Sequence, residues 1–487
     1  MLATSHNFKS NVHDALVDAT LQKALGMMKT GFQVKRAQAF AKLPEFEDLR
    51  EAAKAIKNHT LEHLDFYLET FERNVVARGG QVHWCRTPAE ARETVLGICR
   101  RLGAKTVTKG KSMIAEEIAL NDYLEANNVT PVETDLGEYI IQLRKEPPSH
   151  IIAPAVHLVK EQVADAFRAH HTDLDPGRAL PDARTMCDEA RMELRPKFLA
   201  ADVGITGANF LIAETGTSVI VTNEGNGDLT QTLTKAHIAL ASLEKVVPTL
   251  EDTATILRLL ARSATGQEFS TYTTLSTGPR RAEDTDGPGE YHVVLLDNGR
   301  SAMLGTEFQD MLRCIRCAAC LNHCPVYSAV GGHAYGWVYP GPMGSVLTPS
   351  LIGVEEAGNL PNASTFCGRC ESVCPMKIPL PKMMRHWRER EYEKKLSPAP
   401  YRTGLSVWAF FARRPALYHV MTDIATRVLG FFGRRHGRFR TLPLANGWTQ
   451  VRDLATPEGR SFQSLWAERQ KKKGSHHGGT ETTEKRT

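Results

Sequence analysis

Two short cysteine runs within residues 314–375 constrain this chain more than any other feature. They hold seven of its ten cysteines. The first run reads C-I-R-C-A-A-C-L-N-H-C-P over Cys314–Pro325, and the second reads C-G-R-C-E-S-V-C-P over Cys367–Pro375. The first spacing, C-x2-C-x2-C-x3-C-P, is the iron–sulfur ligand spacing of bacterial ferredoxins. The first run therefore predicts an iron–sulfur site.

The second run has the same pattern without its first cysteine. Three residues before Cys367, where that cysteine would stand, the chain has Ser364. A missing thiolate allows a three-iron cluster, an oxygen ligand such as Ser364, or an iron with an open position. The sequence does not choose among these three outcomes.

Crossed ligation divides the seven thiols into two sets. In two-cluster ferredoxins the cysteine before the proline binds the other cluster. We therefore expect two iron–sulfur clusters of the [4Fe-4S] kind, the second of which could be [3Fe-4S] because it has only three cysteines. The four-thiolate site would use Cys314, Cys317, Cys320 and Cys374, and the three-thiolate site would use Cys324, Cys367 and Cys370.

Zinc and disulfides are the alternatives to iron–sulfur ligation. A structural zinc site needs only two C-x2-C pairs, and a chain without a secretory signal does not usually carry disulfides. The full ferredoxin spacing favours iron–sulfur ligation over both. The remaining cysteines, Cys85, Cys99 and Cys187, are isolated in the sequence, and we interpret them as packing residues.

Length and composition predict a multidomain protein of ordinary globular type. A chain of 487 residues is too long for one core, and 42% hydrophobic with 24% charged residues is typical of soluble proteins. A net charge of +5 does not suggest binding to nucleic acid. We expect a cytoplasmic protein, because the N-terminus has no signal-peptide pattern, no apolar stretch reaches 18 residues, and the cluster thiols must stay reduced.

The first 300 residues alternate between helical and strand patterns, which predicts an α/β domain with a parallel sheet covered by helices. Residues 301–395 would form the cluster domain, 396–466 a helical C-terminal region and 467–487 a disordered tail. The main expected helices are 14–42, 61–78, 88–102, 112–127 and 252–264. The expected strands are 81–85, 105–108, 130–135, 150–154, 237–247 and 291–296, with a hairpin formed by 209–213 and 218–222.

Two stretches in the α/β domain could line a ligand site. Thr108–Ser112 (T-K-G-K-S) joins a strand to a helix, so Lys109, Lys111 and free N–H groups could hold an anion such as a 2-hydroxy acid. The alternative is a plain turn in which Ser112 caps the helix. Thr134–Glu138 (T-D-L-G-E) carries two carboxylates at a strand end.

Asp135 and Glu138 lie near His150 and His157 in the sequence. Such a set could perform acid–base chemistry or bind a metal, although capping of a helix by Asp135 explains the pattern equally well. Two polar turns, at 214–218 and 223–226, flank one apolar strand and are weaker candidates. No G-x-G-x-x-G follows a strand, so a dinucleotide fold is not supported.

The segment that follows the clusters is basic. Between Lys382 and Arg440 there are fourteen Lys and Arg against four Asp and Glu. Apolar residues from Leu417 to Phe432 fall on one helical face between arginine pairs. An interfacial membrane helix is one interpretation, and a helix docked on its own domain or on a partner is the favoured one.

The chain resembles the lactate-utilisation iron–sulfur protein B family over nearly its whole length. The resemblance rests on segments that flank the cysteines as well as on the cysteines themselves. These segments are T-K-G-K-S-M-I-A-E-E-I-A-L-N (108–121), T-D-L-G-E-Y-I-I-Q-L (134–143), A-E-T-G-T-S (213–218), R-C-I-R-C-A-A-C-L-N-H-C-P-V-Y (313–327), G-G-H-A-Y-G (331–336), V-Y-P-G-P-M-G (338–344) and the second cysteine run.

The resemblance implies a lactate-utilisation domain similar to the phosphosugar-isomerase and CoA-transferase fold, an α-helical ferredoxin domain and a short C-terminal region. It also implies electron transfer, with partner proteins of the same system, during oxidation of L-lactate to pyruvate. The family's cluster ligands fall on the seven cysteines assigned above. Ala318 stands where the family more often has glycine. The alternatives are an electron-transfer subunit of a heterodisulfide-type or glycerol-3-phosphate oxidoreductase, and an α/β domain that itself binds a 2-hydroxy acid catalytically.

Overall fold

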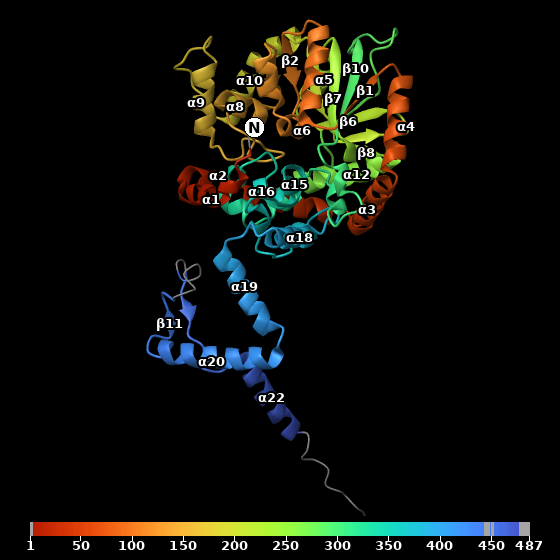
Figure 1. The fold of residues 1–487 in the computed structure, drawn as a ribbon. Coiled ribbons are helices and arrows are strands. Elements are labelled where there is room, and N and C mark those ends of the chain that lie inside the picture. The colour runs from red at the N-terminus through yellow and green to blue at the C-terminus, as the bar shows by residue number, and fades with distance from the viewer. Residues whose placement is uncertain (1–2, 443–448, 450–451, 477–487) are drawn as a thin grey trace, which may run out of the picture. The chain divides into compact units, whose positions relative to one another are not determined.

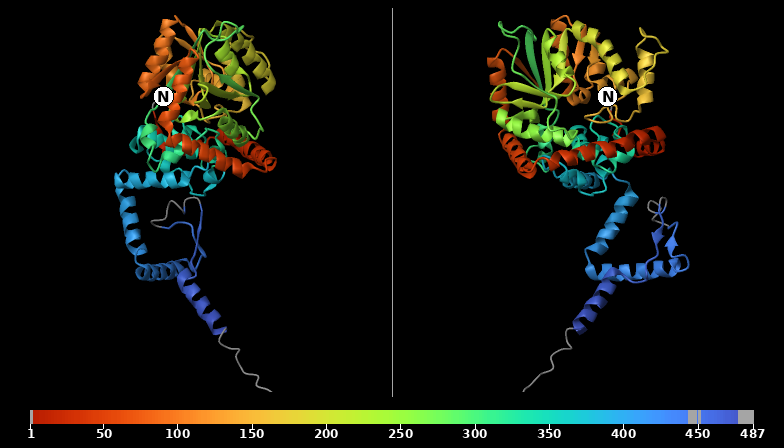
Figure 2. Two further views of the ribbon diagram at one scale, coloured as in Figure 1. Left: turned by 90° about the vertical axis from the view of Figure 1, so that its right-hand side faces the viewer. Right: turned by 180° about the vertical axis from the view of Figure 1, so that it is seen from behind.

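The computed structural model describes residues 3–442, 449 and 452–476. The chain divides into two compact units, Met1–Glu391 and Tyr392–Thr487. The first unit contains the six-stranded and four-stranded sheets, the seven cysteines of the two runs and the N-terminal helices (Figures 1 and 2).

A six-stranded parallel sheet forms the centre of the first unit (Figure 1). Its order is β1-β10-β7-β4-β2-β3, and the register places Tyr291 opposite His237 and Val107 opposite Val203. The strands are β1 (Gln81–Cys85), β2 (Thr106–Lys109), β3 (Thr130–Glu133), β4 (Val203–Gly207), β7 (Ala236–Ser242) and β10 (Glu290–Leu296). The α/β class and the parallel sheet predicted from the alternation are confirmed.

A second, mixed sheet lies beside the first and has the order β8-β5-β6-β9. The predicted hairpin is present in it, because β5 and β6 pair antiparallel with Phe210 opposite Val219. β8 continues the chain after β7, whereas the prediction joined the two into one strand. The strands are β5 (Phe210–Ile212), β6 (Thr217–Thr222), β8 (Val246–Val247) and β9 (Tyr272–Ser276).

Helices cover both faces of the parallel sheet because its strands are apolar on both sides. On one face α5 (Pro88–Arg101), α6 (Met113–Glu117) and α7 (Leu120–Ala126) pack on Val107, Ile205 and Leu240. On the other face α4 (Leu64–Ala77) and the small sheet cover Val293 and Leu295. A further apolar cluster is formed by α8 (Leu136–Arg144), α9 (Lys160–His170) and α10 (Ala183–Ala200). The helix α11 (Asn226–Thr232) packs on β4 and β7. The helix α12 (Leu250–Ala264) packs on α2 and α3.

Several predicted elements differ from the observed ones. The segment 150–154 was expected to be a strand and is an irregular loop, because the His150 ring accepts backbone N–H groups of Ile152 and Ala153 that a strand would use in a ladder. The predicted helix 112–127 breaks at Ala119, which has φ 50°. Predicted helices 14–42 and 61–78 are each two helices, in the first case because Asp18 caps a new one by accepting from the Leu21 N–H.

The N-terminal helices wrap the cysteine-rich segment. α1 (Phe8–Val17) and α2 (Ala19–Ala41) contact α14 (Tyr327–Val330), and α3 (Phe46–Glu62) contacts the turn just before Cys314. In both views of Figure 2 these red helices lie against the cyan segment. Gln33 donates to the carbonyl of Asn322 at 2.8 Å, and Arg36 donates to that of Val373 at 2.8 Å. The first 62 residues therefore belong structurally with residues 314–374.

The 42-residue stretch between the two cysteine runs is buried, not an open loop. It folds into α14, α15 (Gly341–Ile352) and α16 (Val354–Ala357), with Tyr335, Tyr339 and Met343 inside the core. Its glycines allow close packing: a Cβ on Gly344 would lie 1.7 Å from the Tyr339 carbonyl oxygen. α18 (Leu380–Glu393) follows the second run.

The second unit is built of helices and one small hairpin. It contains α19 (Ala399–Ala412), α20 (Pro415–Gly433), β11 (Arg438–Phe439), β12 (Leu454–Ala455) and α22 (Phe462–His476). α22 is helical where a disordered tail was predicted from residue 467, and residues 477–487 lie outside the described residues. The apolar side chains Leu417, Val420 and Ile424 on α20 are exposed. None of the helices in the described part of the chain has the length and apolar character needed to cross a membrane.

Candidate iron–sulfur and ligand sites

The two cysteine runs have the same backbone conformation. Arg316 and Phe366, each just before the C-x2-C pair, have φ 59° and 53°. Ala318 and Gly368, just after the first cysteine of that pair, have φ 58° and 77° and each begins a four-residue helix. The helices are α13 (Ala319–Asn322) and α17 (Arg369–Ser372). The two runs are therefore structural repeats, and Ser364 is the counterpart of Cys314.

Four thiols from the two runs line one small cavity. Its walls include Cys314, Cys317 and Cys320 from the first run and Cys374 from the second. Apart from Arg316, the rest of the lining is apolar and includes Ile151, Ile315, Met343 and Leu380. These four are the cysteines that crossed ligation assigns to one site.

The other three thiols form a second group. Burial and, after it, the neighbouring thiols of Cys324 and Cys367 raise the pKa of Cys370 to about 12. Cys367 is exposed, whereas Cys324 and Cys370 are buried. The two groups are neighbours, because Cys370 also contributes to the raised pKa of Cys320.

The thiols of the first group are in surroundings that disfavour a free thiolate. Burial raises the pKa of Cys374 to about 11, and burial together with the Cys374 and Cys314 thiols raises that of Cys317. Buried thiols that crowd one another ionise only when a cation compensates their charge. This donor set fits a group that brings several metal charges into the cavity. Among the described residues, no three His, Cys, Asp or Glu side chains gather closely enough to hold a single metal ion.

Backbone N–H groups point at the sulfur that precedes each proline. The Tyr327 N–H donates to Cys324 Sγ and the Ile378 N–H donates to Cys374 Sγ, both at 3.5 Å. Hydrogen bonds to cluster sulfurs are one means by which proteins set a reduction potential. The two runs are therefore equivalent also in the backbone hydrogen bond that each makes to the sulfur before its proline.

Ser364 is half-buried and its hydroxyl oxygen accepts the Phe366 N–H at 3.1 Å. Its carbonyl accepts from Arg388 at 3.3 Å, and Arg388 also lies 4.1 Å over the Phe366 ring. The segment before Cys367 is thus held in place although its first cysteine is absent.

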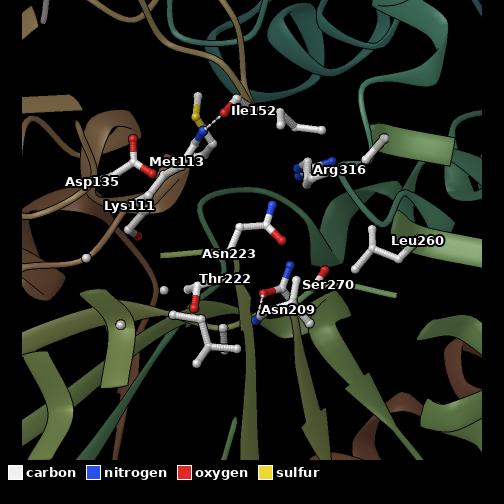
Figure 3. Close-up of a pocket in the computed structure, with 18 of the residues that line it drawn as sticks. Lys111, Met113, Asp135, Ile152, Asn209, Thr222, Asn223, Leu260, Ser270 and Arg316 are labelled. Carbon is white, nitrogen blue, oxygen red and sulfur yellow. Dashed lines mark hydrogen bonds between the residues drawn. The ribbon is translucent and has the colours of Figure 1, made fainter. Parts of the chain in front are cut away.

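A second cavity of about 240 Å³ opens at the carboxyl edge of the parallel sheet (Figure 3). Lys111 follows β2, Asp135 follows β3, Asn209 follows β4 and Lys245 follows β7. In Figure 3, Lys111 and Asp135 lie on one side and Arg316 on the other, with Asn223 between them. Ile151 and Arg316 line this cavity and also the cavity of the four thiols.

A buried ionic network ties Arg316 to the sheet. Arg316 Nη2 lies 3.2 Å from Glu244 Oε1, and Arg300 Nε lies 3.2 Å from Glu244 Oε2. Burial alone would raise the pKa of Glu244, but the charges of Arg300 and Arg316 lower it to about 2. Arg300 also pairs with Glu117 at 2.6 Å. Burial and the charge of Arg316 lower the pKa of Lys245 to about 8.

The chain matches known families along most of its length. Residues 68–296 match the LUD domain, 310–378 match a 4Fe-4S dicluster domain, and 380–471 match the C-terminal region of lactate utilisation protein B. It is 41% identical over 466 residues to lactate utilization protein B of Oceanobacillus iheyensis, covering 96% of this chain and 97% of that one. The chain belongs to the lactate utilization protein B family. The resemblance inferred from the sequence is confirmed.

Further relatives agree. Lactate utilization protein B of Shouchella clausii is 42% identical over 470 residues, covering 96% of this chain and 98% of the relative. The solved structure of a DUF162 family protein from Deinococcus radiodurans is 15% identical, covering 48% of this chain and 98% of that one, with a TM-score of 0.25. At that score the likeness supports no statement about this fold. The family's dicluster domain implies two iron–sulfur clusters, and electron transfer with them.

The structure removes Lys109 from the candidate ligand residues. Its ammonium is 1% exposed and lies 2.8 Å from Glu116 and 2.6 Å from Glu133. Burial opposes the charge, but these carboxylates raise the pKa of Lys109 above its ordinary value. Lys111 does line the sheet-edge cavity, where it donates to the Ile152 carbonyl.

The four residues considered as an acid–base set are not brought together. Asp135 caps α8, accepting from the Gly137 N–H at 3.0 Å, and also lines the sheet-edge cavity. Glu138 faces the Lys109 cluster, and burial raises its pKa. His157 pairs with Glu146 at 2.9 Å. His150 Nε2 lies 3.0 Å from Oδ1 of Asn322, and Asn322 belongs to the first cysteine run.

Of the two polar turns, at 214–218 and 223–226, only the second lines the sheet-edge cavity. Glu214 caps α12 by accepting the Leu250 N–H at 2.7 Å, so the turn at 214–218 is structural. Asn223, Glu224 and Asn226 from the other turn line the sheet-edge cavity. Ser112 caps α6 as predicted, accepting from the Ala115 N–H at 3.2 Å. Cys85 and Cys99 are buried and Cys187 is half-buried, with no disulfide among the described cysteines.

Sequence reasoning missed Lys245, Arg316 and Ile151. Arg316 is one of the two residues between Cys314 and Cys317, where the ferredoxin spacing allows any residue, and Lys245 follows an apolar strand with no motif around it. A usable signal for Lys245 was its place at the end of a predicted strand, since ligands bind at the carboxyl edges of parallel sheets.

Proposed function

We propose that this chain carries electrons through two iron–sulfur clusters in a multi-protein system that oxidises L-lactate to pyruvate. The observation that carries the proposal is the meeting of Cys374 with Cys314, Cys317 and Cys320 around one cavity. Crossed ligation requires a cysteine of the second run in the first site. Membership of the lactate utilization protein B family supports lactate as the fuel.

In this proposal the four-thiolate site uses Cys314, Cys317, Cys320 and Cys374 for a [4Fe-4S] cluster. The three-thiolate site uses Cys324, Cys367 and Cys370, with [4Fe-4S] or [3Fe-4S] as its content. The mutual pKa effects within each group and the cavity around the first group support this division.

Oxidation of L-lactate to pyruvate releases two electrons and two protons. Clusters bound at these sites would supply one-electron redox chemistry, so two of them together accommodate the electron pair. The chain's own residues hold the thiols in place, donate N–H groups to Cys324 and Cys374, and surround the first group with apolar side chains that exclude water.

We place the contact with partner proteins of the lactate system at the three-thiolate site. Cys367 and Phe366 are exposed there, whereas Cys317 is buried. Electron transfer between proteins requires that one site lie near the surface, and among the seven described cysteines of the two runs only Cys367 is exposed.

The test is anaerobic purification with metal analysis and EPR. We expect about seven to eight iron atoms per chain and reduced-state signals of two clusters. Mixing with the partner proteins and L-lactate should then reduce the clusters, whereas glycerol 3-phosphate should not. Zinc without iron would overturn cluster binding, and reduction by glycerol 3-phosphate instead of lactate would overturn the choice of fuel.

A further inference from the structure

The sheet-edge cavity lies where the sheet topology favours a ligand. From β2 the chain runs outward to β3, then returns past β2 to β4 and continues to β7 and β10. The direction reverses between β2 and β4, and ligands of open parallel sheets bind beyond the carboxyl ends of strands at such a reversal. The loops that follow these two strands, 110–112 and 207–209, both line the cavity.

A buried ammonium faces this cavity without a partner. Lys245 is 7% exposed, and among the residues that the structure describes its Nζ makes no hydrogen bond or ion pair. Burying a charge is costly unless it is paired. Arg316 lies nearby on the same cavity, although it already pairs with Glu244. An anionic group placed between Lys245 and Arg316 would compensate the unpaired charge.

The overall charge of the cavity favours a monoanion. Three cations, Lys111, Lys245 and Arg316, and two carboxylates, Asp135 and Glu224, line it. Among the lining residues one positive charge is left over, and Glu244 offsets part of the charge of Arg316, so the cavity matches a carboxylate better than a phosphate dianion. The volume of about 240 Å³ lies below the roughly 300–1,000 Å³ of sites for drug-sized ligands. The ligand is therefore a small one.

Two further polar groups in the cavity lack partners. Thr222 Oγ1 and Asn226 Oδ1 are buried and make no hydrogen bond within the described residues. Asn226 Oδ1 can only accept, so it calls for a donor such as a ligand hydroxyl. Met113, Ile152 and Leu260 supply apolar surface on the same cavity for a short hydrocarbon part. The lining thus has a cationic part for a carboxylate, a polar part at Thr222 and Asn226 for a hydroxyl, and an apolar part for a short hydrocarbon group.

We propose that this cavity binds a short 2-hydroxy acid, with its carboxylate between Lys245 and Arg316 and its hydroxyl at Asn226 and Thr222. The choice of L-lactate as first probe rests on the proposed function. The class of ligand rests on the charge, size and unpaired groups of the cavity.

The site adjoins the four-thiol group through two residues. Arg316 stands between Cys314 and Cys317 in the chain, and with Ile151 it lines both cavities. A carboxylate bound beside Arg316 offsets the positive charge that favours a reduced cluster. Binding of the acid should therefore lower the reduction potential of the four-thiolate cluster and leave the three-thiolate one nearly unchanged.

Calorimetry on the full-length, cluster-loaded protein under anaerobic conditions tests the proposal. L-lactate should bind, while lactamide, which lacks the charge, and inorganic phosphate should bind at least tenfold more weakly. Lys245→Met should weaken lactate binding at least tenfold. The matched control is Lys105→Met, which removes an exposed lysine at the other end of β2 and should leave binding unchanged.

A second variant guards against misfolding of the first. Asn226→Asp keeps the side-chain shape and places a negative charge beside the ligand, so lactate binding should fall at least tenfold. The proposal is overturned if lactate does not bind at millimolar concentration, if lactamide or phosphate binds as well as lactate, or if both variants bind normally. Equal losses in Lys245→Met and Lys105→Met would also overturn it.

Iron content and EPR of the same samples separate the two proposals. Clusters present without lactate binding would refute the cavity assignment alone. Lactate binding in a protein that takes up no iron would refute the electron-transfer proposal alone. A lactate-dependent shift in the potential of one cluster only would support both.

Discussion

The two cysteine runs repeat one backbone and differ in what they enclose. Left-handed residues stand at equivalent places, Arg316 and Phe366, then Ala318 and Gly368. Most residues of the first run are buried, whereas the second run has several exposed residues, Cys367 among them, and has Ser364 in place of its first cysteine. The second run thus has the same backbone turn as the first, although Ser364 stands where the first run has a cysteine. This indicates that the turn before Cys367 has a role that does not depend on a fourth thiolate.

Different residues hold the two runs. His150 and Gln33 bind Asn322 in the first run, from an irregular loop and from α2. Two arginines, Arg36 and Arg50, donate to backbone carbonyls of the second run. The first run is therefore joined both to the α/β domain and to α2, while the second is held by α2 and α3.

The largest expected effect comes from removing the thiol that crosses between the runs. With Cys374→Ser, we expect loss of the four-thiolate cluster and of about half the iron, because Cys374 lines that cavity. Iron analysis and EPR measure this. The control is Cys187→Ser, outside both runs. If Cys374→Ser instead removed the signal that Cys367→Ser removes, the crossed assignment would be wrong.

A smaller effect is expected when the second run is completed. Ser364→Cys should supply a fourth thiolate, so that any oxidised-state three-iron EPR signal disappears and iron is retained longer against a chelator. Ser364→Ala is the control and should not retain iron longer than the native protein. Equal behaviour of the cysteine and alanine variants would show that position 364 does not reach the cluster.

The arginine that holds the second run should affect stability. Arg50 is 7% exposed and donates to the Cys374 carbonyl at 2.7 Å and the Ser372 carbonyl at 3.2 Å. Arg50→Met leaves the buried Cys374 carbonyl without this donor and removes the partly buried bond to Ser372, which should cost about 1–3 kcal/mol of unfolding free energy. Denaturant unfolding under anaerobic conditions measures it. Lys54→Met, one turn along α3 and more exposed, should change it by less than about 0.5 kcal/mol.

The smallest effects concern the left-handed positions. Gly368→Ala should destabilise by about 1 kcal/mol, since φ is 77° and no atom lies within 4 Å of an added Cβ, so the cost is conformational only. Ala318→Gly should change the stability by less than about 0.5 kcal/mol, because relief of the left-handed conformation at φ 58° is offset by loss of a buried methyl group. A destabilisation as large as that of Gly368→Ala would contradict this balance.

The sequence was sufficient for the features that depend on local pattern. β1, the hairpin of β5 and β6, and the caps at Ser112 and Asp135 lie where the residue pattern placed them. The strand expected at 150–154 failed because the side chain of His150 takes over its backbone donors, an interaction with no periodic signal.

The candidate ligand site was only partly accessible from the sequence. Lys111 was found from its strand-to-helix turn, but Lys109 in the same turn is neutralised by Glu116 and Glu133. Lys245 and Arg316 come from distant parts of the chain, and only the folded sheet brings them to one cavity. The observed site therefore differs from the predicted one because ion pairs remove Lys109 from it and the fold adds Lys245 and Arg316 from distant parts of the chain.

The wrapping of residues 314–374 by the N-terminal helices has a consequence for biosynthesis. Ser5 bonds to the Tyr335 carbonyl, Gln22 to that of Ala329 and Arg50 to that of Cys374. The first helices leave the ribosome about 300 residues before their partners, so they must wait through synthesis of the entire α/β domain. The N-terminal helices can close over the cysteines only after residues 314–374 have been made, so this part of the core is completed late in synthesis.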